Sequence, residues 1–180
     1  QVASVSLPAE GTTNTAVIDR FTVVFSENMS AGTVSNLANY SLVSAGPDGA
    51  LDTGDDETYG LSVAYSNGLS ASFRITNGPL QAGACRFTLG TGLTDRALNP
   101  LAEAYVRQFT MAWLADYFVT EDRDNNTNAA ATALARTEDP AGSGMWNGYG
   151  RGNLSSTSDW DYWSFDGQAG DLLTVAAEYP

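Results

Sequence analysis

The stretch of sequence that decides the fold is Arg20-Phe-Thr-Val-Val-Phe25. In an extended chain, two phenylalanines and Val23 point to one face of this stretch, and Thr22 and Val24 point to the other. An alternation of this kind is typical of a β-strand with one buried face. The stretch therefore predicts a strand that runs from Arg20 to Phe25 and places its aromatic side chains in a core.

Similar short runs recur along the first 111 residues, and turn residues separate them. A short turn or a single helical turn is expected around Thr33 to Asn36. This spacing predicts an all-β protein that begins with an immunoglobulin-like β-sandwich over residues 1–112. The other expected strands are Val2 to Leu7, Tyr40 to Val43, Gly60 to Tyr65, Ser72 to Ile75, Cys85 to Leu89 and Val106 to Met111.

Composition and charge exclude several classes of function. The 180 residues are 43% hydrophobic, which is enough for a core, and the net charge of −13 disfavours nucleic acids and anionic membranes as partners. The chain has no histidine, so Ser-His-Asp and Cys-His catalysis are excluded, and we expect no enzyme. The single cysteine, Cys85, lies in an alternating run and is expected to be a buried core thiol.

The sequence changes character after the first domain. An aromatic connector over residues 113–120 is expected to pack at a domain junction, and residues 121–180 form the second part. We expect strands at Trp160 to Phe165 and Leu172 to Ala176, and a short helix from Asn128 to Arg136. About half of the aromatic side chains here are expected in a core, and the alternative is a sugar-stacking or protein-binding face. They are Trp146, Tyr149, Trp160, Tyr162 and Trp163.

The first domain resembles the bacterial Ig-like domain of S-layer and other surface proteins. The resemblance is carried by Phe25-Ser-Glu-Asn-Met29, Asn39-Tyr-Ser-Leu-Val43 and Thr94-Asp-Arg-Ala-Leu-Asn-Pro-Leu101. It implies a spacer or structural module without catalytic residues of its own. It also implies that the protein is extracellular or on a bacterial cell surface.

The second part resembles a pre-peptidase C-terminal domain, which has the fold of clostridial collagen-binding domains. The resemblance rests on Asp122-Arg-Asp-Asn-Asn-Thr127, Asp159-Trp-Asp-Tyr-Trp-Ser-Phe165 and Ala169-Gly-Asp171. It implies a partial, jelly-roll-like sandwich that contains only the first few strands of such a domain.

The same resemblance implies a calcium site in the second part. Crowded carboxylates repel one another unless a cation lies among them, and calcium prefers oxygen ligands. The alternative is a solvated acidic turn. The candidate ligands are Asp122, Asp124, Asn126 and Asp161, with Asp159 as a weaker one.

A second acidic stretch runs from Asp48 to Glu57. It lacks the spacing of an EF-hand loop, and turns favour Asp and Gly, so a protruding hairpin tip explains it better than a metal site does. The candidate ligands of this weaker site are Asp48, Asp52, Asp55 and Asp56.

These observations predict a non-enzymatic extracellular structural module, either a calcium-stabilised spacer or a subunit of a cell-surface assembly or filament. The alternative is a binding module for collagen-like protein or polysaccharide, attached to a secreted hydrolase. A partial sandwich leaves apolar faces and backbone groups uncovered, so we expect either that the chain is a fragment whose partner segment is not included, or that a neighbouring copy completes it by strand addition. Val2 to Leu7 is the natural donor strand.

Overall fold

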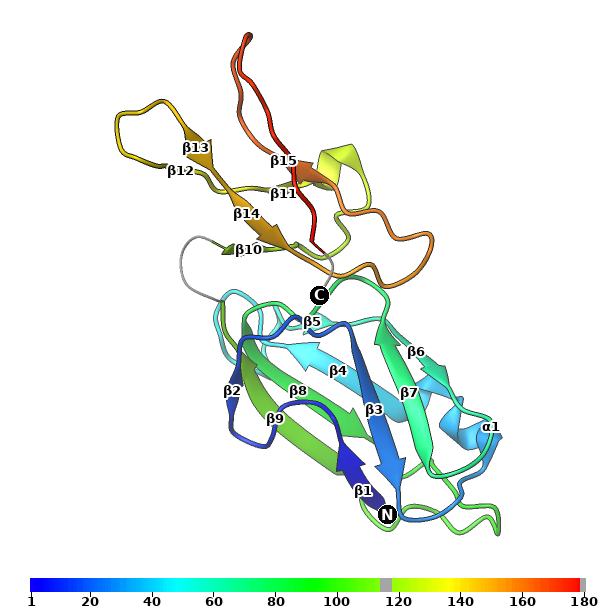
Figure 1. Ribbon diagram of the computed structural model, residues 1–180. Coiled ribbons are helices and arrows are strands. Elements are labelled where there is room, and N and C mark those ends of the chain that lie inside the picture. Colours follow the sequence, from blue (N-terminus) through cyan, green and yellow to red (C-terminus); the bar gives the residue numbers. More distant parts are fainter. Residues whose placement is uncertain (114–117, 179–180) are drawn as a thin grey trace.

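The computed structural model describes residues 1–113 and 118–178 (Figure 1). Residues 1–113 form a sandwich of two β-sheets, with strand orders β1-β3-β7-β6 and β2-β9-β8-β4-β5. The second part, residues 118–178, lies beyond one end of this sandwich (Figure 1). The elements of the sandwich are β1 (Val2–Val5), β2 (Thr13–Asn14), β3 (Arg20–Phe25), α1 (Ala31–Val34), the 3-10 helix η1 (Leu37–Asn39), β4 (Tyr40–Ser44), β5 (Glu57–Thr58), β6 (Leu61–Ala64), β7 (Ser70–Ile75), β8 (Gly83–Leu89) and β9 (Tyr105–Met111).

The core lies between the two sheets. The strand predicted from Arg20 to Phe25 is confirmed as β3, and its alternate apolar side chains are buried. Phe21 stacks on Phe73 of the neighbouring strand β7, with ring centroids 4.9 Å apart. Phe87 on β8 of the facing sheet meets Phe21 edge-on at 5.1 Å. These contacts join the two sheets, and the all-β, immunoglobulin-like sandwich is confirmed.

Cys85 lies on β8 with no exposed surface, as predicted for a core thiol. Burial raises the pKa of its thiol to about 12. The side chain is therefore a neutral thiol at physiological pH and behaves as a small apolar residue.

Within the sandwich, the structure adds two short strands, β2 and β5, that the sequence did not predict. A strand of two residues has too few positions to show a period of two. The expected helical turn is present but begins earlier than predicted, as α1 from Ala31 to Val34.

The second part has no apolar core within the described residues. Its strands form two-stranded pairs, of which β10-β14 and β11-β15 are parallel and β12-β13 is antiparallel. The side chains buried there are all polar, namely those of Thr120, Glu121, Asn125 and Thr132. The elements are β10 (Phe118–Thr120), the 3-10 helix η2 (Asn128–Ala130), β11 (Thr132–Ala133), β12 (Thr137–Glu138), β13 (Trp146–Asn147), β14 (Tyr149–Arg151) and β15 (Trp163–Ser164).

In the second part, one predicted strand and the predicted helix are shorter than expected, and another predicted strand is absent. The strand expected from Trp160 to Phe165 is reduced to β15, and residues 172–176 form no strand. A strand forms only where a neighbour accepts its hydrogen bonds, and these residues have no ladder partner in the described chain. The helix expected from Asn128 to Arg136 gives only η2, after which β11 begins. Half of the predicted aromatic connector, residues 114–117, lies outside the described residues.

Candidate cation site and interdomain joint

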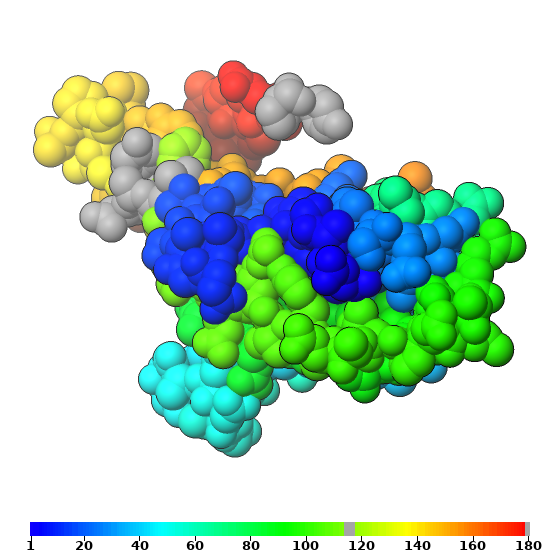
Figure 2. Space-filling model, turned by 90° about the horizontal axis from the view of Figure 1, so that it is seen from below, coloured from blue at the N-terminus to red at the C-terminus, as the bar shows by residue number. Residues whose placement is uncertain are grey.

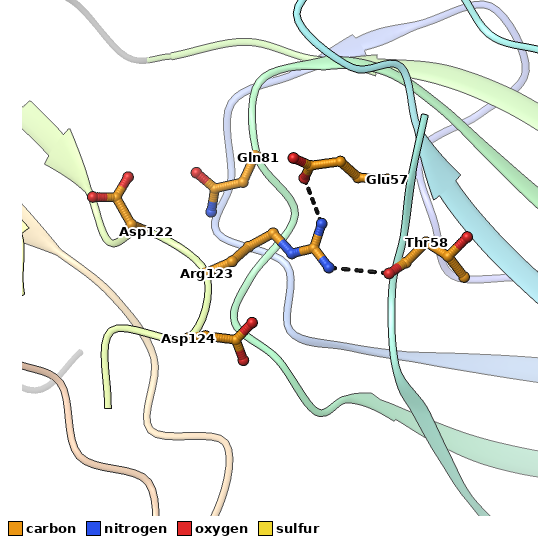
Figure 3. A pocket seen from close by; sticks show the side chains of 6 residues that line it. All are labelled: Glu57, Thr58, Gln81, Asp122, Arg123 and Asp124. Atoms are coloured by element: carbon orange, nitrogen blue, oxygen red, sulfur yellow. Dashed lines mark hydrogen bonds and ion pairs between the residues drawn. The ribbon is translucent and has the colours of Figure 1, made fainter. Parts of the chain in front are cut away.

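Arg123 connects the second part to the sandwich (Figure 3). Its Nη1 donates to the carboxylate of Glu57, and its Nη2 donates to the backbone carbonyl of Thr58 at 3.0 Å. The guanidinium carbon lies 4.3 Å from the ring centroid of Tyr59, and only 18% of the Arg123 side chain is exposed. A Cβ on Gly78 would lie 2.9 Å from the Cα of Arg123, so the two backbones approach closely.

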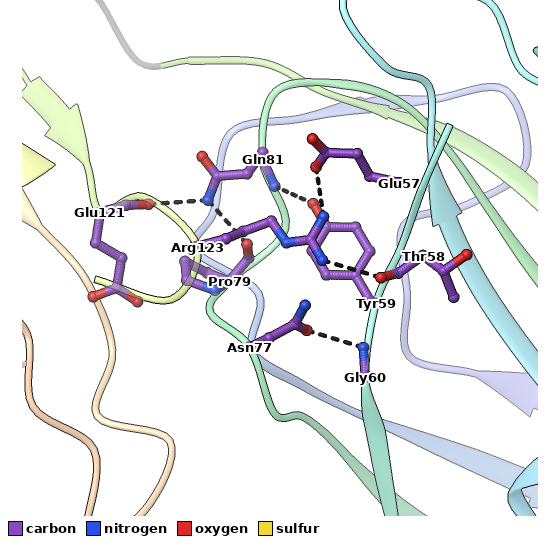
Figure 4. Close-up of polar contacts among 9 residues, drawn as sticks. All are labelled: Glu57, Thr58, Tyr59, Gly60, Asn77, Pro79, Gln81, Glu121 and Arg123. Atoms are coloured by element: carbon purple, nitrogen blue, oxygen red, sulfur yellow. Dashed lines mark hydrogen bonds and ion pairs between the residues drawn. The ribbon is translucent and has the colours of Figure 1, made fainter. Parts of the chain in front are cut away.

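Three further side chains cross between the parts, and the first of them, Arg74 on β7, donates from its Nη1 to the backbone carbonyl of Ser155. The Nε2 of Gln81 donates to the backbone carbonyl of Glu121 at 2.9 Å (Figure 4). The Nη2 of Arg151 donates to the backbone carbonyl of Thr15 at 2.6 Å. We call these three contacts, together with those of Arg123, the joint.

Asp122 and Asp124, two of the predicted calcium ligands, lie on either side of Arg123 (Figure 3). Both are exposed and line an open groove of about 550 Å³ at the joint. A cation bound between them would lie close to the positive guanidinium group, which opposes binding there. These two acids are therefore placed at the joint rather than in a shared ligand cage.

Asn126, a third predicted ligand, lies beside the segment that carries Asp161. Its Oδ1 accepts a hydrogen bond from the backbone N–H of Trp160 at 3.0 Å. Next to this contact, the N–H of Tyr162 donates to the carbonyl of Asn125 at 3.1 Å. The structure thus brings these two predicted segments together. Within residues 1–113 and 118–178, no three Cys, Asp or Glu side chains gather closely enough to hold a metal ion, and the predicted ligand set stays a prediction.

Glu121 is the acid that the sequence analysis missed. Its N–H donates to the carbonyl of Arg151 at 2.9 Å, which continues the β10-β14 ladder by one residue and fixes the backbone before the acidic turn. The residue is only 1% exposed, and its carboxyl accepts a hydrogen bond from the backbone of Asn153. Its Oε2 has no hydrogen-bond partner among the described residues. In the sequence, the only indication that Glu121 is buried was its position directly after β10.

The carboxyl of Glu121 forms a hydrogen-bonded pair with that of Asp161. Burial, this hydrogen bond and the nearby negative charges of Asp161 and Asp159 raise the pKa of Glu121 to about 9. Burial also raises the pKa of Asp161.

The acidic stretch from Asp48 to Glu57 forms the loop between β4 and β5, which protrudes from the sandwich (cyan in Figure 2). Asp52 makes a bidentate ion pair with Arg86, with a shortest distance of 2.6 Å. Asp55 accepts a hydrogen bond from the backbone N–H of Asp48 at 3.1 Å. The carboxylates of Asp52 and Asp55 are therefore already engaged in contacts within the sandwich. The protruding tip is confirmed, and a metal at this loop stays a prediction.

Comparison with known proteins assigns the sandwich. A protein-family model described as a bacterial Ig-like domain matches residues 1–111, which is more than half of the chain. The chain belongs to the bacterial Ig-like domain family. The match ends at the last residue of β9, so the joint lies between this Ig-like domain and the second part. The comparisons do not show a pre-peptidase C-terminal domain, and that resemblance stays a prediction.

Solved structures provide more distant similarities to the Ig-like domain. The copper resistance protein PcoC from Escherichia coli is 18% identical, with a TM-score of 0.46, over 62% of this chain and 99% of that chain. The surface layer protein SbsC, domains 1–6, is 19% identical, with a TM-score of 0.42, over 67% of this chain and 16% of that chain. The curated proteins contain no match. Among the described residues, no helix has the length and apolar character needed to cross a membrane.

The aromatic residues beyond the Ig-like domain are more exposed than predicted. Trp146 is 53% exposed and Trp160 is 65% exposed, so the expected burial of about half of this group is wrong. The reason is that no apolar core forms among residues 118–178 to receive them. Trp146 lies under Arg136, at 5.5 Å from the ring centroid, and lines an open groove of about 350 Å³ with Phe165. A role of this groove in binding protein or polysaccharide stays a prediction.

The expected donor strand is used within its own chain. Val2–Val5 pairs with β3 as β1, and Val5 and Leu7 are buried in the core of the Ig-like domain. Choosing this segment to complete a neighbouring copy was therefore wrong, because its backbone and side chains are already engaged. The apolar residues expected to lie uncovered include Leu173 and Val175, which are 58% and 77% exposed.

Proposed function

We propose that this chain is a non-catalytic structural module of a bacterial surface or secreted protein. In this proposal the Ig-like domain and the second part act as one stiff unit, as a spacer or as a subunit of a surface assembly. The observation that carries the proposal is the joint. A flexible tether makes few contacts across it, whereas here Arg123, Gln81 and Arg151 each reach across and bond to the other part.

Most of the strength of the joint is assigned to Arg123. Glu57 is 52% exposed, so the ion pair alone contributes little. The hydrogen bond to the carbonyl of Thr58 and the stacking over Tyr59 involve a largely buried guanidinium group. Hydrogen bonds from charged groups contribute about 1.5–3 kcal/mol and cation–π contacts about 0.5–2 kcal/mol. Together they favour a fixed orientation over free rotation.

Calcium is proposed as the stabiliser of the second part. Its buried side chains are polar, so hydrophobic burial contributes little to its stability. A ligand that binds only the folded form stabilises it by RT ln(1 + [L]/Kd), about 2.7 kcal/mol at a hundredfold excess over Kd. Carboxylate oxygens of the second part are the kind of ligand that such an ion prefers.

Assembly is proposed to involve the exposed apolar side chains of the second part. Phe165, Leu172, Leu173 and Val175 are all at least 44% exposed. The two-stranded pairs also leave strand edges open to a further strand. These features support association with additional β-structure, such as that of a second copy.

Arg123→Ala is expected to uncouple the second part from the Ig-like domain. All four tryptophans lie beyond β9, so their fluorescence reports mainly on the second part, while far-ultraviolet circular dichroism follows the sandwich. In the unaltered chain the two thermal transitions should coincide, and in Arg123→Ala the fluorescence transition should occur at lower temperature. Arg96→Ala, at an exposed arginine in the turn after β8, is the control with the same change of charge. Two separate transitions in the unaltered chain would refute the stiff unit.

A further inference from the structure

An open groove in the second part brings aromatic and charged side chains together. It measures about 350 Å³ and is lined by residues 133–136, by Trp146 of β13 and by residues 164–166 at the end of β15. We call it the Trp146 groove. Its strands lie on the side of the second part away from the Ig-like domain (Figure 1). A ligand can therefore enter the groove without disturbing the joint.

The backbone that lines the groove is already engaged within the fold. The N–H of Leu134 donates to the carbonyl of Ser164 at 2.7 Å, which ties this segment to β15. The following strand, β12, pairs with β13. A Cβ on Gly148 would lie 2.9 Å from the carbonyl oxygen of Ala135, so the chain after β13 also runs against the segment. Recognition in the groove therefore falls to side chains rather than to a free strand edge.

Two aromatic rings line the groove and keep much of their surface in water. Trp146 is 53% exposed and Phe165 is 44% exposed. The guanidinium carbon of Arg136 lies 5.5 Å from the ring centroid of Trp146, and this contact restrains the indole. Exposed aromatic rings of this kind stack on the apolar C–H faces of sugar rings, because both surfaces are flat and weakly polar.

The groove also offers one hydrogen-bond donor group and one acceptor group that the fold does not use. Among the described residues, neither the guanidinium of Arg136 nor the carboxylate of Asp166 has a hydrogen-bond or ion-pair partner. An anion would satisfy only the arginine, a cation only the aspartate, and an apolar ligand neither. A hydroxyl group both donates and accepts, so neighbouring hydroxyls on a sugar ring can bond to both side chains.

We propose that the Trp146 groove binds a neutral polysaccharide. Trp146 and Phe165 stack on its sugar rings, and Arg136 and Asp166 bond to its hydroxyl groups. The ligand is neutral because the two charges of the groove cancel and the chain, with a net charge of −13, repels polyanions. It is a polymer because the groove is open and a chain of sugars can pass along it. This role goes beyond that of a spacer and attaches the module to a glycan.

The test is affinity electrophoresis of the full chain in native gels that contain hydroxyethylcellulose, arabinoxylan, galactomannan or dextran. We expect at least one of these polysaccharides to retard the unaltered chain, with an affinity that does not change with salt concentration. Trp146→Ala should weaken this binding about tenfold or more, because aromatic anchors carry much of the energy of a binding site. Asp166→Ala should weaken it as well.

Trp160→Ala is the matched control, because Trp160 is 65% exposed and does not line the groove. It should keep the affinity of the unaltered chain, and unchanged thermal midpoints should show that all three variants fold. Equal binding by Trp146→Ala would overturn the site. Retardation by none of these polysaccharides, or binding only to polygalacturonate or to a collagen-like Gly-Pro-Pro peptide, would overturn the ligand class. The joint is tested separately by Arg123→Ala.

Discussion

Phe73→Ala is expected to lower the free energy of unfolding of the Ig-like domain by about 3–5 kcal/mol. The Phe73 side chain is 1% exposed and stacks on Phe21, and it meets Tyr40 from the facing sheet with ring centroids 4.8 Å apart. Truncation removes this apolar burial and leaves a cavity between the sheets. Urea unfolding followed by circular dichroism measures the change.

The matched control is Ser72→Ala, on the neighbouring position of β7. Ser72 is exposed on the opposite face of the strand, so its truncation should change the stability by less than about 0.5 kcal/mol. If Phe73→Ala lowered the free energy of unfolding no more than Ser72→Ala does, Phe73 would not lie in the core between the two sheets.

Gly46→Ala is expected to destabilise the Ig-like domain by about 1–3 kcal/mol. A Cβ at this position would lie 2.1 Å from the backbone carbonyl oxygen of Asp55, so the two sides of the acidic loop must move apart. Gly54→Ala is the control in the same loop, because its Cβ would meet nothing within 4 Å. Thermal unfolding in EDTA compares the two variants. Equal stability would show that close backbone approach does not set the shape of this loop.

Alternation predicted the Ig-like domain well, because its strands pair with close neighbours and bury one face. The segment from Arg20 to Phe25 has the predicted bounds as β3, since both of its edges are paired. Residues 172–176 also alternate, yet they form no strand without a partner in the described chain. Local pattern therefore indicates which segments are suited to a sheet, and pairing decides which of them become strands.

The sequence pointed to the acidic stretch but not to the contacts that its residues make, and the calcium site itself stays a prediction. The acidic stretch was recognised, and Asn126 lies beside the segment of Asp161 as expected. Glu121 is the buried acid because of its pairing with the carbonyl of Arg151, thirty residues further along the chain, and no local pattern encodes that contact. The role of Arg123 likewise depends on a contact with a residue distant in the sequence, Thr58 on β5 of the Ig-like domain.

A distance measurement between the two parts tests the central claim of one stiff unit most directly. Spin labels can be attached at Ser72→Cys on β7 and Thr137→Cys on β12, both exposed positions, because the buried Cys85 is inaccessible to the reagent. Double electron–electron resonance should give one narrow distance distribution in this chain, and a broader one when Arg123→Ala is added. A broad distribution with Arg123 in place would contradict the account, because the two parts would then move independently.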